Sequence, residues 1–272
     1  MSGLSSVVDT WIVLDSSSFG PVLLAPSTQT GSPEKSFAIV TSFQGARYHP
    51  DVVRGLAESG DAVANAAGSI AALVPPGSPG LILDFQEMAP EDLTLLAHVS
   101  RAIADSARAK GVKQIALIIP AGDSAAYPAA TLARIADLLI VRLFPEHGVG
   151  TAAGPVVSPP WFARGLGARA GEIGVTRIVA GLPVDGVLWS ARDSARRVSY
   201  TEALQLAERA STSFVRDPAS GNLHATSARD GWEIWLADHE LIERLVADGR
   251  RIGVTRFALF GLDGADPLLL RR

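Results

Sequence analysis

The chain of 272 residues contains no cysteine, which excludes disulfides and thiolate metal sites. No apolar run approaches the ~18 residues that would indicate a membrane-spanning helix. Only 19% of the residues are charged and the net charge is −4, so the basic surface of a nucleic-acid-binding protein is absent. Residues 1–11 lack the basic start and long apolar stretch of a signal peptide. Lysine is scarce while alanine, arginine and glycine are plentiful, a composition typical of GC-rich bacterial genomes.

Hydrophobic residues make up 47% of the chain and are concentrated in short runs, as in buried parallel strands. Segments with apolar residues at helical spacing lie between the runs, and several of these segments end at glycine. Strand alternating with helix in a chain of this length favours a (β/α)8 TIM-type barrel over an open doubly wound sheet. The runs are 10–15, 37–43, 81–85, 115–121, 138–144, 178–183 and 257–262.

Two segments depart from the strand–helix pattern. Residues 21–27 fit either an eighth strand or a hairpin with residues 10–15. Residues 213–238 alternate in polarity around the turn Ser220-Gly221-Asn222, which predicts a small antiparallel insertion before the last helix. We expect this insertion to lie beside the mouth of a pocket, within a single barrel domain of residues 1–272.

Polar residues collect where the predicted strands end, and in barrels of this type the chemistry is located at the C-terminal ends of the strands. For most of these residues, solvation of a loop is a sufficient explanation. Asp84 differs because it lies inside the apolar run 81–85, and strand alternation places it on the same face as Gln86. The polar and aromatic residues at strand ends are Asp84, Gln86, Glu87, Asp123, Glu146, His147, Asp185, Trp189, Asp263 and Asp266.

The segment PGLILDFQ (79–86) resembles the fourth-strand motif D-G-x-x-x-D-x-E of glycoside hydrolase family 18. The likeness is to its bacterial branch of spore-cortex-lytic enzymes and of barrel domains attached to polysaccharide deacetylases. It continues through 138–162, 178–189 and 253–267, and covers roughly residues 37–267. The N-terminal 36 residues look more like the second strand of the family than the first, so a barrel altered at its first strand, or a truncated chain, is expected.

The resemblance implies binding or cleavage of β-1,4-linked glycans that contain N-acetylglucosamine, such as chitin or peptidoglycan. Family members use the acetamido group of the substrate as the nucleophile, an exception to the scheme with two carboxylates. A glutamate protonates the leaving oxygen, and an aspartate two residues earlier orients the acetamido group. Asp84 matches that aspartate, but Gln86 occupies the position of the acid, and a neutral amide has no proton to donate.

Other positions depart from the family pattern as well. Phe144 and Pro145 stand where the family has a tyrosine and an aspartate, Phe260 replaces a tryptophan, and Asp185 replaces an aromatic residue. Arg142 stands where the family has methionine. If Arg142 faces the barrel interior it requires an anionic partner, and Asp84 or Asp185 is expected to pair with it. Alternatively, Arg142 faces outward among the helices.

The sequence therefore indicates a barrel that binds a glycan, with hydrolysis doubtful. One alternative is an active glycosidase whose acid has moved to Glu146, Glu87 or the neighbouring His147. Another is a non-catalytic scaffold for protein interaction.

No cofactor is expected, and the histidines show no metal-ligand spacing. The family resemblance suggests the cell envelope or the extracellular space. Four tryptophans either stack on sugars or pack in the core, namely Trp161, Trp189, Trp232 and Trp235. The substrate-binding candidates are Glu87, Arg142, Phe144, His147, Asp185, Trp189 and Phe260.

Overall fold

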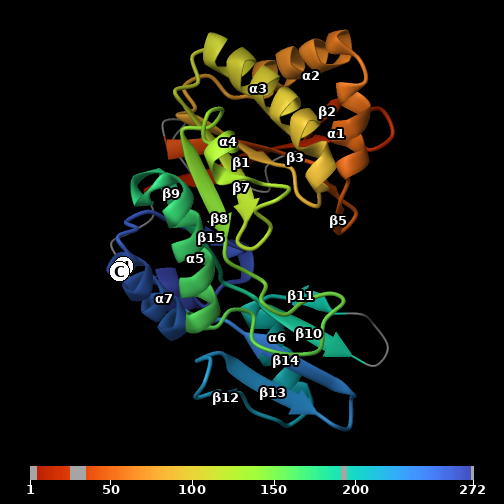
Figure 1. The fold of residues 1–272 in the computed structure, drawn as a ribbon. Coiled ribbons are helices and arrows are strands. Elements are labelled where there is room, and N and C mark those ends of the chain that lie inside the picture. The colour runs from red at the N-terminus through yellow and green to blue at the C-terminus, as the bar shows by residue number, and fades with distance from the viewer. Residues whose placement is uncertain (1–4, 25–34, 191–194, 271–272) are drawn as a thin grey trace. The chain divides into compact units, whose positions relative to one another are not determined.

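The computed structural model describes residues 5–24, 35–190 and 195–270. The chain divides into two compact units, Leu4–Ile140 and Val141–Arg272, each of which is described by itself (Figure 1). Each of the predicted apolar runs overlaps a strand. No helix in the described part of the chain has the length and hydropathy needed to cross a membrane.

The first unit is built on a sheet with the strand order β7-β6-β3-β1-β2. Four of these strands are parallel, as predicted, while β2 returns antiparallel to β1. Residues 21–24 therefore form the hairpin and not a further parallel strand, and residues 25–27 lie outside the described part. The strands are β1 (Val7–Leu14), β2 (Pro21–Leu24), β3 (Ser36–Thr41), β6 (Gly80–Asp84) and β7 (Gln114–Pro120).

The helices of the first unit begin at residues suited to helix starts. Ser59 caps α2 through its hydroxyl, which accepts a hydrogen bond from the amide of Ala62. The turn before α3 is tied to α1 by a bidentate contact of Arg54 with Asp92, at 2.6 Å for the shortest pair of atoms. The elements are the hairpin β4 (Phe43–Gln44) and β5 (Arg47–Tyr48), then α1 (Pro50–Ala57), α2 (Gly60–Leu73), a 3-10 helix at Pro90–Asp92, α3 (Leu93–Ala109) and α4 (Ala129–Leu132).

The second unit contains a parallel sheet segment with the order β15-β9-β8. The helices α5 and α7 contact each other, and α5 also contacts β9. Gly181 in β9 leaves room for its neighbours, because a Cβ there would lie 2.9 Å from the carbonyl of Val141 and 3.0 Å from the ring of Phe260. The elements are β8 (Leu138–Arg142), α5 (Pro159–Ile173), β9 (Ile178–Pro183), α7 (His239–Ile252), β15 (Phe257–Phe260) and 3-10 helices at Val175–Arg177, Leu262–Gly264 and Pro267–Leu270.

The second unit also carries an antiparallel sheet with the order β11-β10-β14-β13-β12. The predicted antiparallel pairing within 213–238 is confirmed, but β10 and β11 come from an earlier part of the chain that the sequence analysis did not assign to this sheet. One face packs on α6 (Tyr200–Arg209). The position of the insertion beside a pocket mouth and the single barrel domain remain predictions. The strands are β10 (Gly186–Ser190), β11 (Arg196–Val198), β12 (Val215–Arg216), β13 (Leu223–Ser227) and β14 (Trp232–Leu236).

Candidate functional site

Asp84 is the last residue of β6, and its side chain is the centre of a buried hydrogen-bond cluster in the first unit. Its Oδ2 accepts hydrogen bonds from the hydroxyl of Tyr48 at 2.9 Å and that of Thr41 at 3.2 Å. Its Oδ1 accepts one from Nε2 of Gln86 at 3.2 Å. Thr41 is the register partner of Asp84 on the neighbouring strand, which explains their contact across the sheet. Three donors therefore converge on a carboxylate that is only 6% exposed.

Gln86 is held by two acceptors, and this decides what its position can do. Besides Asp84, its Nε2 donates to the carbonyl oxygen of Ile118 on β7, at 2.8 Å. The side chain is buried, with 5% exposure. An ionised glutamate at this position would direct its oxygens at two other oxygens, so the site suits an amide donor better than a carboxylate.

The loop after β6 is fixed by a buried tyrosine. The hydroxyl of Tyr127 donates to the carbonyl of Phe85 and accepts from the amide of Met88, both at 2.9 Å. Burial raises the pKa of Tyr127, so its hydroxyl keeps the proton that it donates. Between these contacts Glu87 adopts a left-handed backbone with φ of 63° and its side chain is exposed.

A second group of predicted residues meets in the second unit, at the C-terminal ends of β8, β9 and β15. The rings of Phe144 and Phe260 lie 5.2 Å apart between centroids at a tilt of 60°. The guanidinium carbon of Arg142 lies 5.4 Å from the centroid of Phe144, within cation–π range. Asp185, just beyond β9, is buried and forms an ion pair with Arg197 on β11.

Burial dominates the electrostatics of Asp185. It raises the pKa of this carboxyl above its ordinary value, although the charges of Arg197 and, to a smaller extent, Arg142 act in the opposite direction. Arg142 is thus close enough to influence Asp185. Its predicted ion pair with Asp84 or Asp185 remains a prediction.

The loop that follows β8 holds Glu146 and His147 in structural contacts. The Oε2 of Glu146 accepts a hydrogen bond from the amide of Ser158, at 2.6 Å, directly before α5. The ring of His147 packs against Gly154, where a Cβ would lie 2.8 Å from the imidazole. These contacts fix the loop and leave the carboxylate of Glu146 acting as an acceptor.

The face of the antiparallel sheet opposite α6 presents half-buried aromatic side chains. Trp189 donates through Nε1 to the carbonyl of Thr151 at 3.3 Å. Trp235 donates to Glu233 at 2.7 Å and stacks on His224, with ring centroids 4.3 Å apart. Trp161 in α5 and Trp232, which packs on the α6 side of the sheet, are half-buried but do not belong to this face. Aromatic rings held in this way suit either packing or contact with a sugar.

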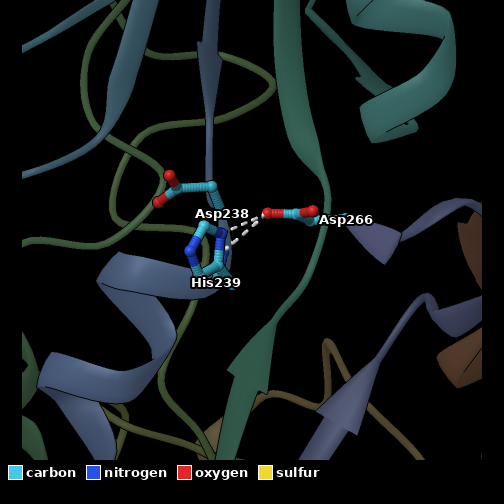
Figure 2. Close-up of side chains that lie close together, drawn as sticks. All are labelled: Asp238, His239 and Asp266. Atoms are coloured by element: carbon cyan, nitrogen blue, oxygen red, sulfur yellow. Dashed lines mark hydrogen bonds and ion pairs between the residues drawn. The ribbon is translucent and has the colours of Figure 1, made fainter. Parts of the chain in front are cut away.

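Asp238, His239 and Asp266 lie close together at the start of α7, and Figure 2 shows the imidazole facing Asp266. His239 Nδ1 and Asp266 Oδ2 are 2.7 Å apart, and the pairing raises the pKa of His239. Asp238 caps α7 through the amide of Leu241 and pairs with Arg216 at 2.6 Å. Both carboxylates are thus engaged by protein donors at a helix N-terminus, where negative charge is stabilised, so the cluster needs no metal ion to account for it.

Comparison with known proteins places this geometry in context. No protein-family model matches the chain. Its fold superposes on the spore cortex-lytic enzyme SleL of Bacillus cereus with a TM-score of 0.76 and 15% identity, covering 92% of this chain and 63% of that one. It also superposes on a chitinase from Chromobacterium violaceum with a TM-score of 0.75 and 16% identity, covering 97% and 88%. The fold is that of chitinases and spore cortex-lytic enzymes.

This likeness confirms the predicted (β/α)8 barrel type of fold and the resemblance to glycoside hydrolase family 18. In sequence, the chain is 25% identical over 122 residues to "Uncharacterized glycosylase YvbX" of Bacillus subtilis (strain 168). That segment covers 42% of this chain and 35% of the relative, so the match spans about a third of the relative's length.

The structure brings together some of the predicted site residues and adds others. Asp84 and Gln86 touch, as do Phe144 and Phe260, while Glu87 is exposed and Glu146 is engaged by α5. Sequence reasoning missed Thr41, Tyr48 and Arg197. The missed residues reach the site through strand register and hairpins, and no local motif identifies them.

Proposed function

We propose that the chain is a carbohydrate-active domain of the family 18 type, which binds a glycan containing N-acetylglucosamine and hydrolyses it slowly or not at all. The observation that carries the proposal is the buried contact of the Gln86 amide with Asp84 and the Ile118 carbonyl. General acid catalysis typically contributes about 10²–10⁴-fold to a rate. A glycan is chosen as the ligand because the structural neighbours are named a spore cortex-lytic enzyme and a chitinase, and YvbX is named a glycosylase.

The network around Asp84 supports binding without turnover. Tyr48, Thr41 and Gln86 fix the carboxylate in one orientation, which would preorganise it to accept a hydrogen bond from a sugar amide. The protonated donor that glycosidic cleavage needs is missing from the position next to it. The arrangement therefore favours recognition over bond cleavage.

The alternative of a relocated acid has little support among the contacts of its candidates. Glu146 accepts a short hydrogen bond from the backbone amide of Ser158, so its carboxylate is engaged in holding the start of α5. Glu87 points into solvent from a left-handed turn. We expect Glu146→Gln and Glu87→Gln to leave any residual activity unchanged.

The scaffold alternative has one observation in its favour. Four apolar residues around the hairpin of the first unit have exposed fractions of 40–48%, namely Trp11, Val22, Leu24 and Phe43. The last three of these residues line a shallow cleft of about 240 Å³ with Val13. A chain that binds no glycan would favour a role for this apolar surface in protein interaction.

The test of the proposal combines turnover with binding. Reducing-end release from chitotetraose is expected to be near background, and isothermal titration calorimetry is expected to detect binding that Asp84→Asn weakens. Asp123→Asn, at the end of a different strand and exposed, is the matched control. Turnover on the order of 1 per second, the low end of typical enzymes, would refute the absence of hydrolysis. Absence of binding to any glycan would refute the proposal as a whole.

A further inference from the structure

Arg197 is an exposed cation held in place by a buried carboxylate. Its Nε donates to Oδ2 of Asp185 at 2.6 Å, and its Nη2 pairs with the same oxygen. The side chain of Asp185 is 9% exposed, whereas that of Arg197 is 64% exposed. The aspartate thus fixes the guanidinium, and the guanidinium remains open to solvent.

The contact with Asp185 uses one edge of the guanidinium group. A guanidinium has five N–H donors in a planar fork, and Asp185 occupies the Nε and Nη2 side. Within the described part of the chain, Nη1 of Arg197 has no acceptor. The edge formed by Nη1 and the second hydrogen of Nη2 is therefore available, and its geometry matches a carboxylate.

The backbone beside this pair leaves room for it. Gly261 directly follows β15 with a φ of 92°, and a Cβ there would lie 2.9 Å from Nη2 of Arg197 and 3.2 Å from Oδ2 of Asp185. Any larger residue at 261 would displace the guanidinium or the carboxylate. Phe260 precedes this glycine, so the pair lies next to the aromatic contact of Phe260 with Phe144.

The sheet register places Arg197 in a row with aromatic residues. Arg197 is the register partner of Val187, which in turn is the partner of Trp235. These three side chains therefore share the face opposite α6. The exposed guanidinium of Arg197 therefore lies beside the aromatic surface of this sheet face.

We infer that the edge of Arg197 formed by Nη1 and Nη2, oriented by Asp185, binds the carboxylate of a hexuronic acid residue in the glycan ligand. The inference rests on the proposed function and deepens it by naming the substrate class. A neutral N-acetyl sugar has no anion that would use this edge. An acidic sugar supplies a planar carboxylate for the fork and an apolar ring face for Phe260.

The test compares one acidic glycan with its neutral counterpart. The probes are a hyaluronan tetrasaccharide, in which glucuronic acid alternates with N-acetylglucosamine, and the same tetrasaccharide after reduction of its carboxylates to alcohols. By isothermal titration calorimetry we expect the acidic form to bind at least tenfold more tightly, with an advantage that shrinks at high salt. Arg197→Gln is expected to remove this difference in affinity between the acidic and the reduced form.

Arg196→Gln is the matched control because Arg196 is the neighbouring residue on β11 and pairs instead with Glu202, at 2.7 Å. This variant is expected to keep the preference for the acidic form. If Arg197→Gln fails to fold because Asp185 is left unpaired, the double variant Asp185→Asn/Arg197→Gln removes both charges and serves in its place. A folded double variant that still prefers the acidic form would overturn the inference.

The outcomes separate this inference from the proposed function. Equal affinity for the acidic and reduced probes, or binding of chitotetraose with no binding of hyaluronan, overturns the carboxylate site and leaves glycan binding standing. Failure to bind any of the three probes overturns both. A tenfold preference that Arg197→Gln abolishes supports the carboxylate site.

Discussion

Gln86→Glu restores the side chain that the family resemblance implies, and the structure predicts that it destabilises the protein. The amide Nε2 of Gln86 lies 3.2 Å from a carboxylate oxygen of Asp84 and 2.8 Å from the Ile118 carbonyl oxygen. Glutamate places an acceptor where both neighbours need a donor. The side chain is 5% exposed, so water does not compensate for the mismatch.

The loss of stability caused by Gln86→Glu depends on pH, and the direction of this dependence follows from ionisation of the new carboxyl group. Below the ordinary glutamate pKa of about 4.3, the new side chain is protonated both folded and unfolded, and its hydroxyl can satisfy one acceptor, leaving a loss of about 1 kcal/mol. As the pH rises, the glutamate ionises first in the unfolded chain. Each pH unit between its ordinary pKa and the raised pKa in the folded protein then lowers the free energy of unfolding by about 1.4 kcal/mol. With burial raising that pKa by roughly two units, the total loss reaches about 4 kcal/mol at pH 8.

Urea unfolding at pH 4 and pH 8, followed by circular dichroism, measures this difference. Gln205→Glu, on the exposed side of α6, is the matched control and is expected to change stability by less than about 0.5 kcal/mol at either pH. Release of reducing ends is expected to stay near background in Gln86→Glu. A variant as stable as the parent at pH 8, or one with turnover on the order of 1 per second, would show that position 86 tolerates an ionised acid.

Three further predictions concern Tyr48, Glu146 and His239. Tyr48→Phe removes a donor to the buried Asp84 and is expected to cost about 1–2 kcal/mol in urea unfolding. Glu146→Gln keeps an acceptor for the start of α5 and should be nearly neutral, whereas Glu146→Ala should cost about 1 kcal/mol by the same measurement. The raised pKa of His239 beside Asp266 means that its ion pair stabilises the fold fully below about pH 6.5 and is lost as the pH rises through the folded value. His239→Gln should therefore lower the melting temperature at pH 6 and much less at pH 9, and an equal decrease at both values would contradict this assignment.

The strands were predictable because buried parallel strands must be apolar on both faces. The run 81–85 and the observed Gly80–Asp84 differ by one residue at each end. The strands β10 and β11 were not recognised, since Gly186–Ser190 follows β9 after two residues and has no polar alternation of its own. β14, the pairing partner of β10 on its other side, begins more than 40 residues after β10 ends, so no local pattern links the two strands.

The centre of the candidate site was predictable for the same physical reason that made Asp84 unusual. A carboxylate inside an apolar run must find donors, and the structure provides three of them. The identity of those donors was not predictable. Thr41 reaches Asp84 by strand register and Tyr48 by the β4–β5 hairpin, and both depend on the folded backbone. The pairing of Asp185 with Arg197 likewise joins β9 to a strand that the sequence did not reveal.

The direction of the parallel strands in the first unit has a practical consequence for attaching the protein to a surface. The only lysines in the sequence are Lys35, Lys110 and Lys113. Lys35 directly precedes β3, and the other two lie between α3 and β7, at the edge where these strands begin. Asp84 lies at the opposite edge, where β6 ends. Coupling through lysine amines to a sensor chip or a fluorophore would therefore leave the Asp84 edge open to the dissolved glycan, and Lys→Arg changes at these positions would select a single attachment point.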